Sequence, residues 1–155
     1  MKKKMCRRIG ETYPYLKSFK RKYPSTVAWR IKRHARIIDI HLNENEKILY
    51  AFVAQKNEGM FDFVNTYAIV LTNKRLMLGT KRLLCGYFFT AITPDMFNDL
   101  TAKGHLLWGD IEIDTVKEFI TLSNISKKAL PEIGKKVTDL MMKEKRKYQL
   151  NRCAK

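Results

Sequence analysis

The chain has few of the residues that build a disulfide framework and no apolar run long enough to cross a membrane. Its 3 cysteines, Cys6, Cys85 and Cys153, lie far apart and form no CxxC pair. Dispersed cysteines in odd number predict reduced thiols in a cytoplasmic protein, with Cys85 as a small core residue inside its apolar run. No apolar segment follows the basic start, so we expect no signal peptide, and no window reaches the length of a bilayer span.

Motifs of known catalytic and metal sites are also missing. The sequence has no phosphate-binding glycine loop, no nucleophile elbow and no HExxH. Its 3 histidines, His34, His41 and His105, have no acidic or cysteine partner at the spacing of metal ligands. We expect two of them at the face and the end of a basic helix, and His105 in a strand or turn.

Three acids alternate along one predicted strand, at Asp110, Glu112 and Asp114. Such a row can hold a hard cation, but it is more typical of the solvated face of an antiparallel strand with lysines beside it. We therefore expect no metal, no cofactor and no small-molecule substrate, and we expect that the protein is not an enzyme.

Acidic residues are scarce at both ends of the chain. Residues 1–36 carry 13 Lys/Arg against one acid, residues 37–125 carry 8 against 11, and residues 126–155 carry 10 against 3. The resulting charges of +12, −3 and +7 sum to the formal +16. Because net charge acts on association rather than topology, we expect the middle to hold the fold and the ends to select an acidic partner.

The two ends are predicted as extensions of a single domain. Residues 1–24 read as a basic arm, irregular or marginally helical, since Pro14 and Pro24 interrupt any long helix. Residues 143–155 read as a basic tail that frays. A chain of 155 residues has the length of one domain with such additions.

Residues 25–42 are predicted as an amphipathic basic helix. The expected span is 26–41, capped by Ser25 or Thr26, with an apolar side made of Val27, Ile31, Ala35, Ile38 and Leu42. These apolar residues either pack against the rest of the fold or face a membrane surface.

Residues 43–142 are predicted as the folded domain. About seven short strands with turns at close spacing suggest a barrel or sandwich, and a last amphipathic helix opens at Ser126 with Pro131 in its first turn. Asn73 favours a tight hairpin, and Gly86 favours a bulge or bend. The expected strands are 47–56, 66–72, 75–82, 83–92, 99–107, 110–118 and 118–125.

Four segments in this order resemble the bacterial pleckstrin-homology (PH)-like domains, in particular those of the YokE type, over about residues 44–142. They are Glu46-Lys47-Ile48-Leu49, Val70-Leu71-Thr72-Asn73-Lys74-Arg75-Leu76, Leu107-Trp108-Gly109-Asp110-Ile111-Glu112-Ile113 and Leu130-Pro131-Glu132-Ile133. The resemblance implies a mainly β fold: a barrel of two nearly orthogonal antiparallel sheets capped by the C-terminal helix. In this chain the predicted amphipathic helix of residues 25–42 precedes the barrel.

The resemblance also bears on function. Eukaryotic PH domains often bind phosphoinositides through basic residues around the first strand-to-strand loop. In this chain that loop, residues 55–65, has Lys56 against Glu58 and Asp62, so we do not expect lipid-headgroup specificity. The family implies binding or self-association rather than catalysis.

We therefore predict a non-catalytic binding module that contacts an acidic protein surface or a second copy of itself. The candidate binding residues are Arg30, Lys32, Arg33, Arg36, Lys74, Arg75, Lys81, Arg82, Lys143, Lys145, Arg146 and Lys147. Two alternatives remain open at this point. The basic ends can bind nucleic acid non-specifically, with Tyr13, Tyr15 and Phe19 stacking on unpaired bases, or the basic helix can attach the protein to the periphery of an anionic membrane.

Overall fold

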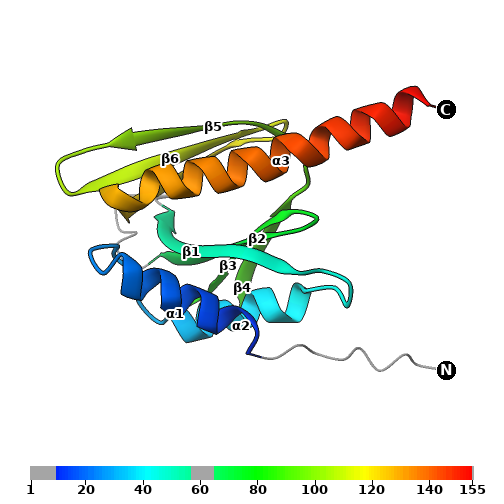
Figure 1. The fold of residues 1–155 in the computed structure, drawn as a ribbon. Coiled ribbons are helices and arrows are strands. Elements are labelled where there is room, and N and C mark those ends of the chain that lie inside the picture. Colours follow the sequence, from blue (N-terminus) through cyan, green and yellow to red (C-terminus); the bar gives the residue numbers. More distant parts are fainter. Residues whose placement is uncertain (1–9, 57–64, 155) are drawn as a thin grey trace, which may run out of the picture.

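Seven antiparallel strands form one curled sheet in the order β4-β3-β2-β1-β7-β6-β5. The computed structural model describes residues 10–56 and 65–154, and its sheet bends into a half-barrel (Figure 1). This confirms the predicted PH-like fold class with its N-terminal and C-terminal helices. The strands are β1 (Ile48–Lys56), β2 (Thr66–Thr72), β3 (Leu76–Lys81), β4 (Tyr87–Ile92), β5 (Phe97–Gly104), β6 (Trp108–Thr115) and β7 (Phe119–Ser126).

The strands form where the sequence alternates or runs apolar. Every residue of β2 is buried, because helices cover one face of this part of the sheet and the barrel interior lies on the other. In β6 the alternation is clean: Ile111, Ile113 and Thr115 are buried, and the acids between them point outward. Continuous burial is expected for a strand that is covered on both faces, and strict alternation is expected for a strand that is covered on one face.

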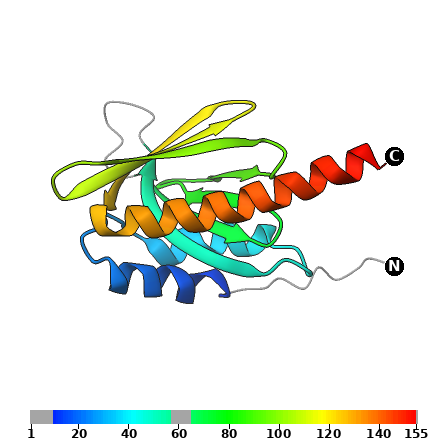
Figure 2. The same cartoon turned by 45° about the horizontal axis from the view of Figure 1, so that its top comes forward.

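The C-terminal helix α3 (Leu130–Cys153) lies across the half-barrel (Figures 1 and 2). A short 3-10 turn, η1 (Lys127–Ala129), leads into it, and Pro131 stands in the first turn as predicted. The buried stripe of α3 contains Leu130, Ile133, Val137 and Met141. The prediction of a frayed tail after residue 142 was wrong for the described residues. The helix continues beyond the sheet, because no proline or glycine follows Gly134 to end it.

The basic arm, predicted as irregular or marginally helical, is a packed helix over much of its described part. Residues Thr12–Lys22 form the helix α1, which packs on β1 with Leu16 and Phe19 buried. Pro14 is tolerated because the first helical N–H groups have no intrahelical acceptor to lose. The basic start of the chain from residue 10 is therefore part of the hydrophobic core, while residues 1–9 lie outside the described residues.

Helix α2 (Ile31–His41) begins five residues after the predicted start, and neither Ser25 nor Thr26 caps it. Backbone and side-chain groups of the preceding residues bond to the barrel instead. Thr26 Oγ1 accepts from the Ser126 N–H at 3.0 Å, and the Val27 N–H donates to the Asn124 carbonyl at 3.0 Å. These long-range bonds hold the segment extended, which local helix propensity cannot overcome.

The apolar side of α2 faces the sheet. Ala35 and Ile38 are buried, and the helix packs on β2 and β3. A Cβ at Gly79 would lie 3.0 Å from Ile38 Cδ1 and 3.1 Å from Ile37 Cγ2, so the absence of a side chain on β3 permits this close approach. Packing of this apolar side against the barrel, one of the two predicted outcomes, is therefore the one observed.

Cys85 was placed wrongly in the core. It is exposed in the β3–β4 turn, because the fourth strand begins at Tyr87 rather than at residue 83. Gly86 has φ +80°, a left-handed conformation that suits glycine and reverses the chain here. Cys153 is exposed near the end of α3, and Cys6 lies outside the described residues. Within the described part of the chain, no helix combines the length and the apolar character needed to cross a bilayer.

Candidate functional site

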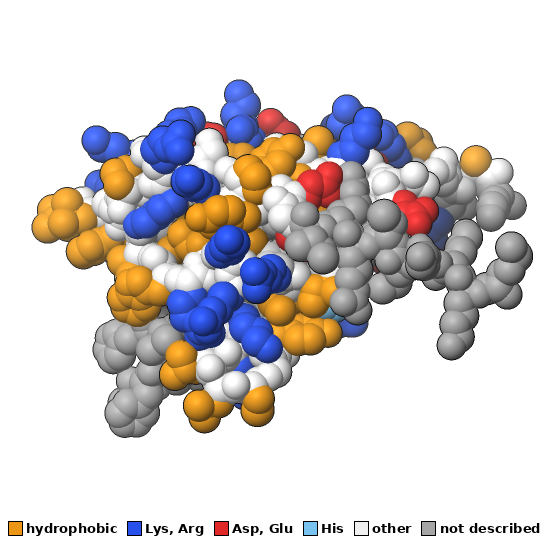
Figure 3. Space-filling model, turned by 90° about the horizontal axis from the view of Figure 1, so that it is seen from below, with side chains coloured by type: hydrophobic (Ala, Val, Ile, Leu, Met, Phe, Trp, Pro, Cys, Tyr) orange, Lys and Arg blue, Asp and Glu red, His pale blue; other side chains and the backbone are white. Residues whose placement is uncertain are grey.

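A groove between α1 and α2 carries seven Lys/Arg side chains and no acidic one. Its volume is about 990 Å³. Seen from below, this face shows Lys and Arg side chains around a central apolar area (Figure 3). We call this feature the basic groove. It is lined by Tyr13, Lys17, Lys20, Arg21, Pro24, Ala28, Trp29, Arg30, Ile31, Lys32, Arg33 and Arg36.

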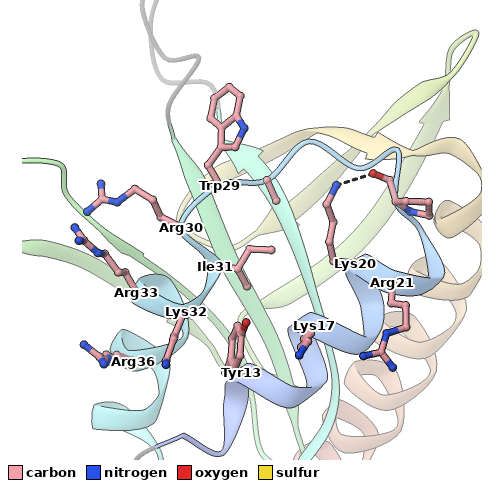
Figure 4. Close-up of a pocket in the computed structure, with 12 residues that line it drawn as sticks. Tyr13, Lys17, Lys20, Arg21, Trp29, Arg30, Ile31, Lys32, Arg33 and Arg36 are labelled. Carbon is pink, nitrogen blue, oxygen red and sulfur yellow. Dashed lines mark hydrogen bonds between the residues drawn. The ribbon is translucent and has the colours of Figure 1, made fainter.

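Helix α1 supplies one wall of the basic groove. Lys17 and Arg21 are four residues apart and therefore share a face of the helix, where both are exposed (Figure 4). Lys20 turns toward the following loop and donates to the carbonyl of Pro24 at 2.6 Å and to that of Thr26. Burial lowers the pKa of Lys20 below its ordinary value. Lys20 therefore holds the loop in place, while its two neighbours remain directed outward.

Helix α2 and the residue before it supply the opposite wall. Arg30 precedes the helix with φ 54°, a left-handed conformation that costs a non-glycine residue on the order of 1 kcal/mol. The chain must turn here because the preceding segment is bonded to the barrel. Lys32, Arg33 and Arg36 follow on the exposed side of α2, and Lys32 Nζ lies 6.0 Å from the centre of the Tyr13 ring. No ion pair between two described residues joins any of these cations to an acid.

The floor and rim of the basic groove are apolar or aromatic. In the close-up, Ile31 and Tyr13 lie between the cations of the two walls (Figure 4). Trp29 stands at one end with half of its surface, 50%, exposed. Its backbone N–H donates to Thr66 Oγ1 at 3.0 Å, so β2 positions the residue that carries the indole. The site therefore combines positive charge with apolar surface and one accessible aromatic ring.

Buried polar contacts set the spacing of the two walls. The Asp39 carboxylate of α2 accepts from the Gly10 N–H at 2.8 Å and from the Thr12 N–H at 2.9 Å, and so satisfies unpaired donors at the start of α1. On the other side of α2, His34 Nδ1 accepts from the Lys81 N–H at 2.9 Å. Burial, reinforced by the nearby charge of Arg30, lowers the pKa of His34 to about 4, so the ring is neutral at pH 7.

Four other predicted binding residues lie away from the basic groove, at the two ends of β3. Lys74 and Arg75 are in the β2–β3 turn, whereas Lys81 and Arg82 are at the β3–β4 turn, about 20 Å away along six residues of strand. Arg75 contacts the buried Glu46, with Nε 2.9 Å from Oε1. These four cations therefore form two groups rather than one cluster.

The Arg75–Glu46 contact is structural. The carboxylate of Glu46 also accepts from Thr72 Oγ1 at 2.7 Å and from the Asn43 N–H at 3.1 Å. Burial acts to raise the pKa of Glu46, but the hydrogen bonds from Arg75, Thr72 and Asn43 outweigh it and lower the pKa. The Arg75 guanidinium is thus used within the fold.

The predicted residues of α3 are also separate from the basic groove. Lys145 Nζ donates to the Phe97 carbonyl at 2.6 Å, and Lys147 pairs with Glu144 at 2.7 Å. Lys143 and Arg146 line a shallow hollow on α3 together with Met142 and Leu150. The structure thus brings Arg30, Lys32, Arg33 and Arg36 together in the basic groove, and Lys143, Arg146 and Lys147 in this separate hollow, which also contains Asp139.

The acidic row of β6 is paired rather than convergent. Lys103 contacts Glu112 at 2.7 Å, and His105 Nε2 lies 3.0 Å from Asp110 Oδ2. Across residues 10–56 and 65–154, no group of three or more His, Cys, Asp or Glu side chains is placed to hold a metal ion. The solvated-face interpretation of this row describes its contacts well.

Sequence analysis did not place Lys17, Lys20, Arg21 and Trp29 in a site. Lys17 and Arg21 have the i, i+4 spacing of one helix face, so a helix prediction for this segment would have grouped them. The position of Trp29 could not be found in this way, because it depends on a bond to β2, 37 residues later in the chain.

A match to a family model agrees with this fold. The model of a family described as "Bacterial PH domain" matches residues 42–139. A solved structure, described as the C-terminal domain of an unknown protein from Leishmania infantum, is 19% identical with a TM-score of 0.48. The match covers 63% of this chain and 85% of that chain. Among curated proteins, none matches.

Proposed function

Because this chain belongs to the bacterial PH domain family, we propose that it is a non-catalytic binding module whose basic groove receives an acidic segment of a partner protein. Assignment to the YokE type and a cytoplasmic location are parts of the same proposal. The observation that carries it is the lining of the groove: seven of its twelve residues are Lys or Arg and none is acidic.

Electrostatics favours an anionic occupant. Seven like charges around one hollow repel each other, and this repulsion favours negative charge between them. A peptide carrying Asp or Glu removes this repulsion. The apolar floor at Ile31 and Ala28 then favours a segment that also has apolar side chains. An acidic, partly apolar peptide matches both properties.

A second candidate is single-stranded nucleic acid, favoured by Trp29. Its indole is half exposed beside Arg30, and aromatic side chains next to cations stack on unpaired bases. Phosphates would occupy the same positions as the carboxylates of a peptide. Stacking is the property that separates the two ligands, since an acidic peptide does not require it.

The test measures binding of two labelled probes, an oligoglutamate peptide containing leucine and a single-stranded oligonucleotide, by fluorescence anisotropy at low and moderate salt. Arg33→Glu with Arg36→Glu should weaken binding of the peptide at least about tenfold. The matched control is Lys143→Glu with Arg146→Glu, which changes the net charge equally on α3 and should weaken binding by less than about threefold. Equal losses in the two variants would refute a role for the groove.

Trp29→Ala separates the two ligands. If the partner is a protein, the substitution changes peptide binding little; if it is nucleic acid, oligonucleotide binding falls by roughly 1–3 kcal/mol. Sedimentation of the free protein over a range of concentrations tests self-association, the other form of a protein partner. A dimer that the Arg33→Glu and Arg36→Glu changes dissociate would identify a second copy as the occupant.

A further inference from the structure

The β3–β4 turn exposes two adjacent leucines at the tip of a hairpin. Leu84 is 94% exposed and Leu83 is 67% exposed, in a part of the chain that contains no acid between Lys81 and Ile92. The turn is closed by the Arg82 N–H, which donates to the Gly86 carbonyl at 3.2 Å. A defined turn thus holds apolar side chains away from the core, where they contact water at a cost in free energy.

Aromatic and basic residues flank this tip. Tyr87 and Phe88 are neighbours on β4, so their rings lie on opposite faces of the hairpin, and both are exposed. The Arg82 guanidinium lies 4.4 Å from the centre of the Phe88 ring. Lys81 stands opposite Tyr87 in the strand pair. From the tip of the turn toward the body of the protein, the two leucines come first, and the aromatic rings and cations follow.

Further positive charge lies beside the base of the hairpin. His34 Nδ1 contacts the Lys81 N–H at 2.9 Å, and this histidine belongs to the first turns of α2, which also carry Arg30 and Arg33. The end of β3 therefore lies beside the first turn of α2, and Leu83 and Leu84 project beyond this contact.

We propose that the β3–β4 hairpin docks the protein on an anionic membrane surface by inserting Leu83 and Leu84 below the headgroups. Leucines enter the acyl boundary, aromatic rings remain at the interface, and cations contact lipid phosphates. The projecting shape favours a bilayer over an acidic protein, since a soluble partner would need a matching apolar pocket inside an acidic surface. The basic groove is not required for this insertion.

The test is co-sedimentation with vesicles of phosphatidylcholine alone or mixed with phosphatidylserine. The full chain should bind the anionic vesicles and bind the neutral ones much less. Leu83→Ser with Leu84→Ser should weaken binding at least about tenfold, because each leucine loses a full side chain of apolar burial. Lys81→Gln with Arg82→Gln should weaken it roughly fivefold for each cation.

A matched control comes from the β5–β6 turn. Leu106 and Leu107 are also adjacent and exposed, at 89% and 60%, so Leu106→Ser with Leu107→Ser removes the same apolar surface elsewhere. This variant should bind within about twofold of the parent. Equal loss in the two leucine pairs would refute a specific role for the β3–β4 tip, as would failure of the parent to bind either vesicle.

Cys85 provides an independent readout at the tip. In a Cys6→Ser, Cys153→Ser background, a polarity-sensitive dye on Cys85 should shift to shorter wavelength when anionic vesicles are added. The same dye on Cys153, in a Cys6→Ser, Cys85→Ser background, should not shift. Vesicle binding without a shift at Cys85 would refute insertion. The proposal would also be refuted if the protein bound no vesicles and instead formed a dimer that Leu83→Ser with Leu84→Ser dissociates.

Discussion

The two basic ends of this chain resemble each other in sequence but differ in structure. Helices α1 and α2 each pack one side against the sheet. The cations on their exposed sides therefore line the same groove, and no acidic residue lines it. The cations near the end of α3 lie on a helix that extends beyond the sheet (Figure 2). A dense run of Lys and Arg therefore forms a groove without acidic residues only where two packed helices direct their exposed sides to one surface.

The make-up of the two surfaces explains this difference. On α3, Lys143, Arg146 and Lys147 have i, i+3 and i+4 spacing and share a face with Asp139, whereas Lys145 points to another side of the helix. Lys145 and Lys147 also have partners, the Phe97 carbonyl and Glu144. On α1 and α2, burial of Leu16, Phe19, Ala35 and Ile38 restricts the cations to the remaining faces. The core thus arranges the charge.

The largest expected effect tests which end belongs to the core. Phe19→Ala should lower the free energy of unfolding by about 3–5 kcal/mol, because the buried ring lies 6.0 Å from that of Phe52 and its removal leaves a cavity. The measurement is urea denaturation followed by circular dichroism. Tyr148→Ala, on the half-exposed part of α3, should cost less than about 1 kcal/mol. Equal costs would contradict the assignment of α1 to the core.

A second, smaller effect tests the contact that positions α1 on α2. Asp39→Ala should cost about 1–3 kcal/mol, because two backbone N–H groups lose a buried carboxylate. Glu144→Ala removes an exposed contact with Lys147 on α3 and should cost less than about 0.5 kcal/mol. Both values come from the same denaturation experiment. A cost for Asp39→Ala as small as that of the control would show that α1 is held by apolar packing alone.

The smallest effect at neutral pH concerns His34 on α2. The pKa of His34 is lowered to about 4 from 6.5, so the unfolded state binds more protons between these values. Its contribution to stability is therefore present above pH 6.5 and is lost as the pH falls toward 4. In thermal unfolding, the Tm of His34→Gln should therefore fall less steeply than that of the parent as the pH is lowered from 6.5 to 4. An unchanged slope would refute a buried neutral histidine.

Glu132 on α3 provides the comparison at lower pH. Burial acts to raise its pKa, but hydrogen bonds from Lys22, Tyr23 and Lys136 lower it to about 2 from 4.5. The carboxylate therefore stabilises the fold above pH 4.5, and this contribution is lost as the pH falls toward 2. In Glu132→Gln, Tm should fall less steeply with pH below pH 4.5, and its dependence on pH between 4.5 and 6.5 should not change. The two regions are thus distinguished by the pH at which each loses stability.

Local pattern was sufficient for much of the sheet. The predicted second strand has the same bounds as β2, and the alternation of β6 gave the correct buried face, because side-chain period directly reports which faces are covered. The order of strands and last helix then led to the PH-like fold. Asn73 lies in the β2–β3 turn as predicted, although its φ is not positive. Gly86, predicted as a bulge or bend inside the fourth strand, lies instead in the turn before β4.

The candidate site was less accessible to such reasoning. Arg30, Lys32, Arg33 and Arg36 lie in one groove because they share one short segment, and their role in binding stays a prediction. The α1 wall was missed, since Pro14 was taken as an interruption although it stands in the first helical turn. The exposed β3–β4 tip was missed because Leu83 and Leu84 read as strand residues, and their exposure depends on where pairing with β3 ends.

The amino-acid sequence by itself determined the strands, the apolar side of each amphipathic segment and the concentration of positive charge at the two ends. These are local properties, set by side-chain period and composition. Tertiary structure decided which charges meet. The start of α2, the position of Trp29 and the two walls of the basic groove depend on hydrogen bonds and packing between residues far apart in the chain, whose free energies exceed local propensity.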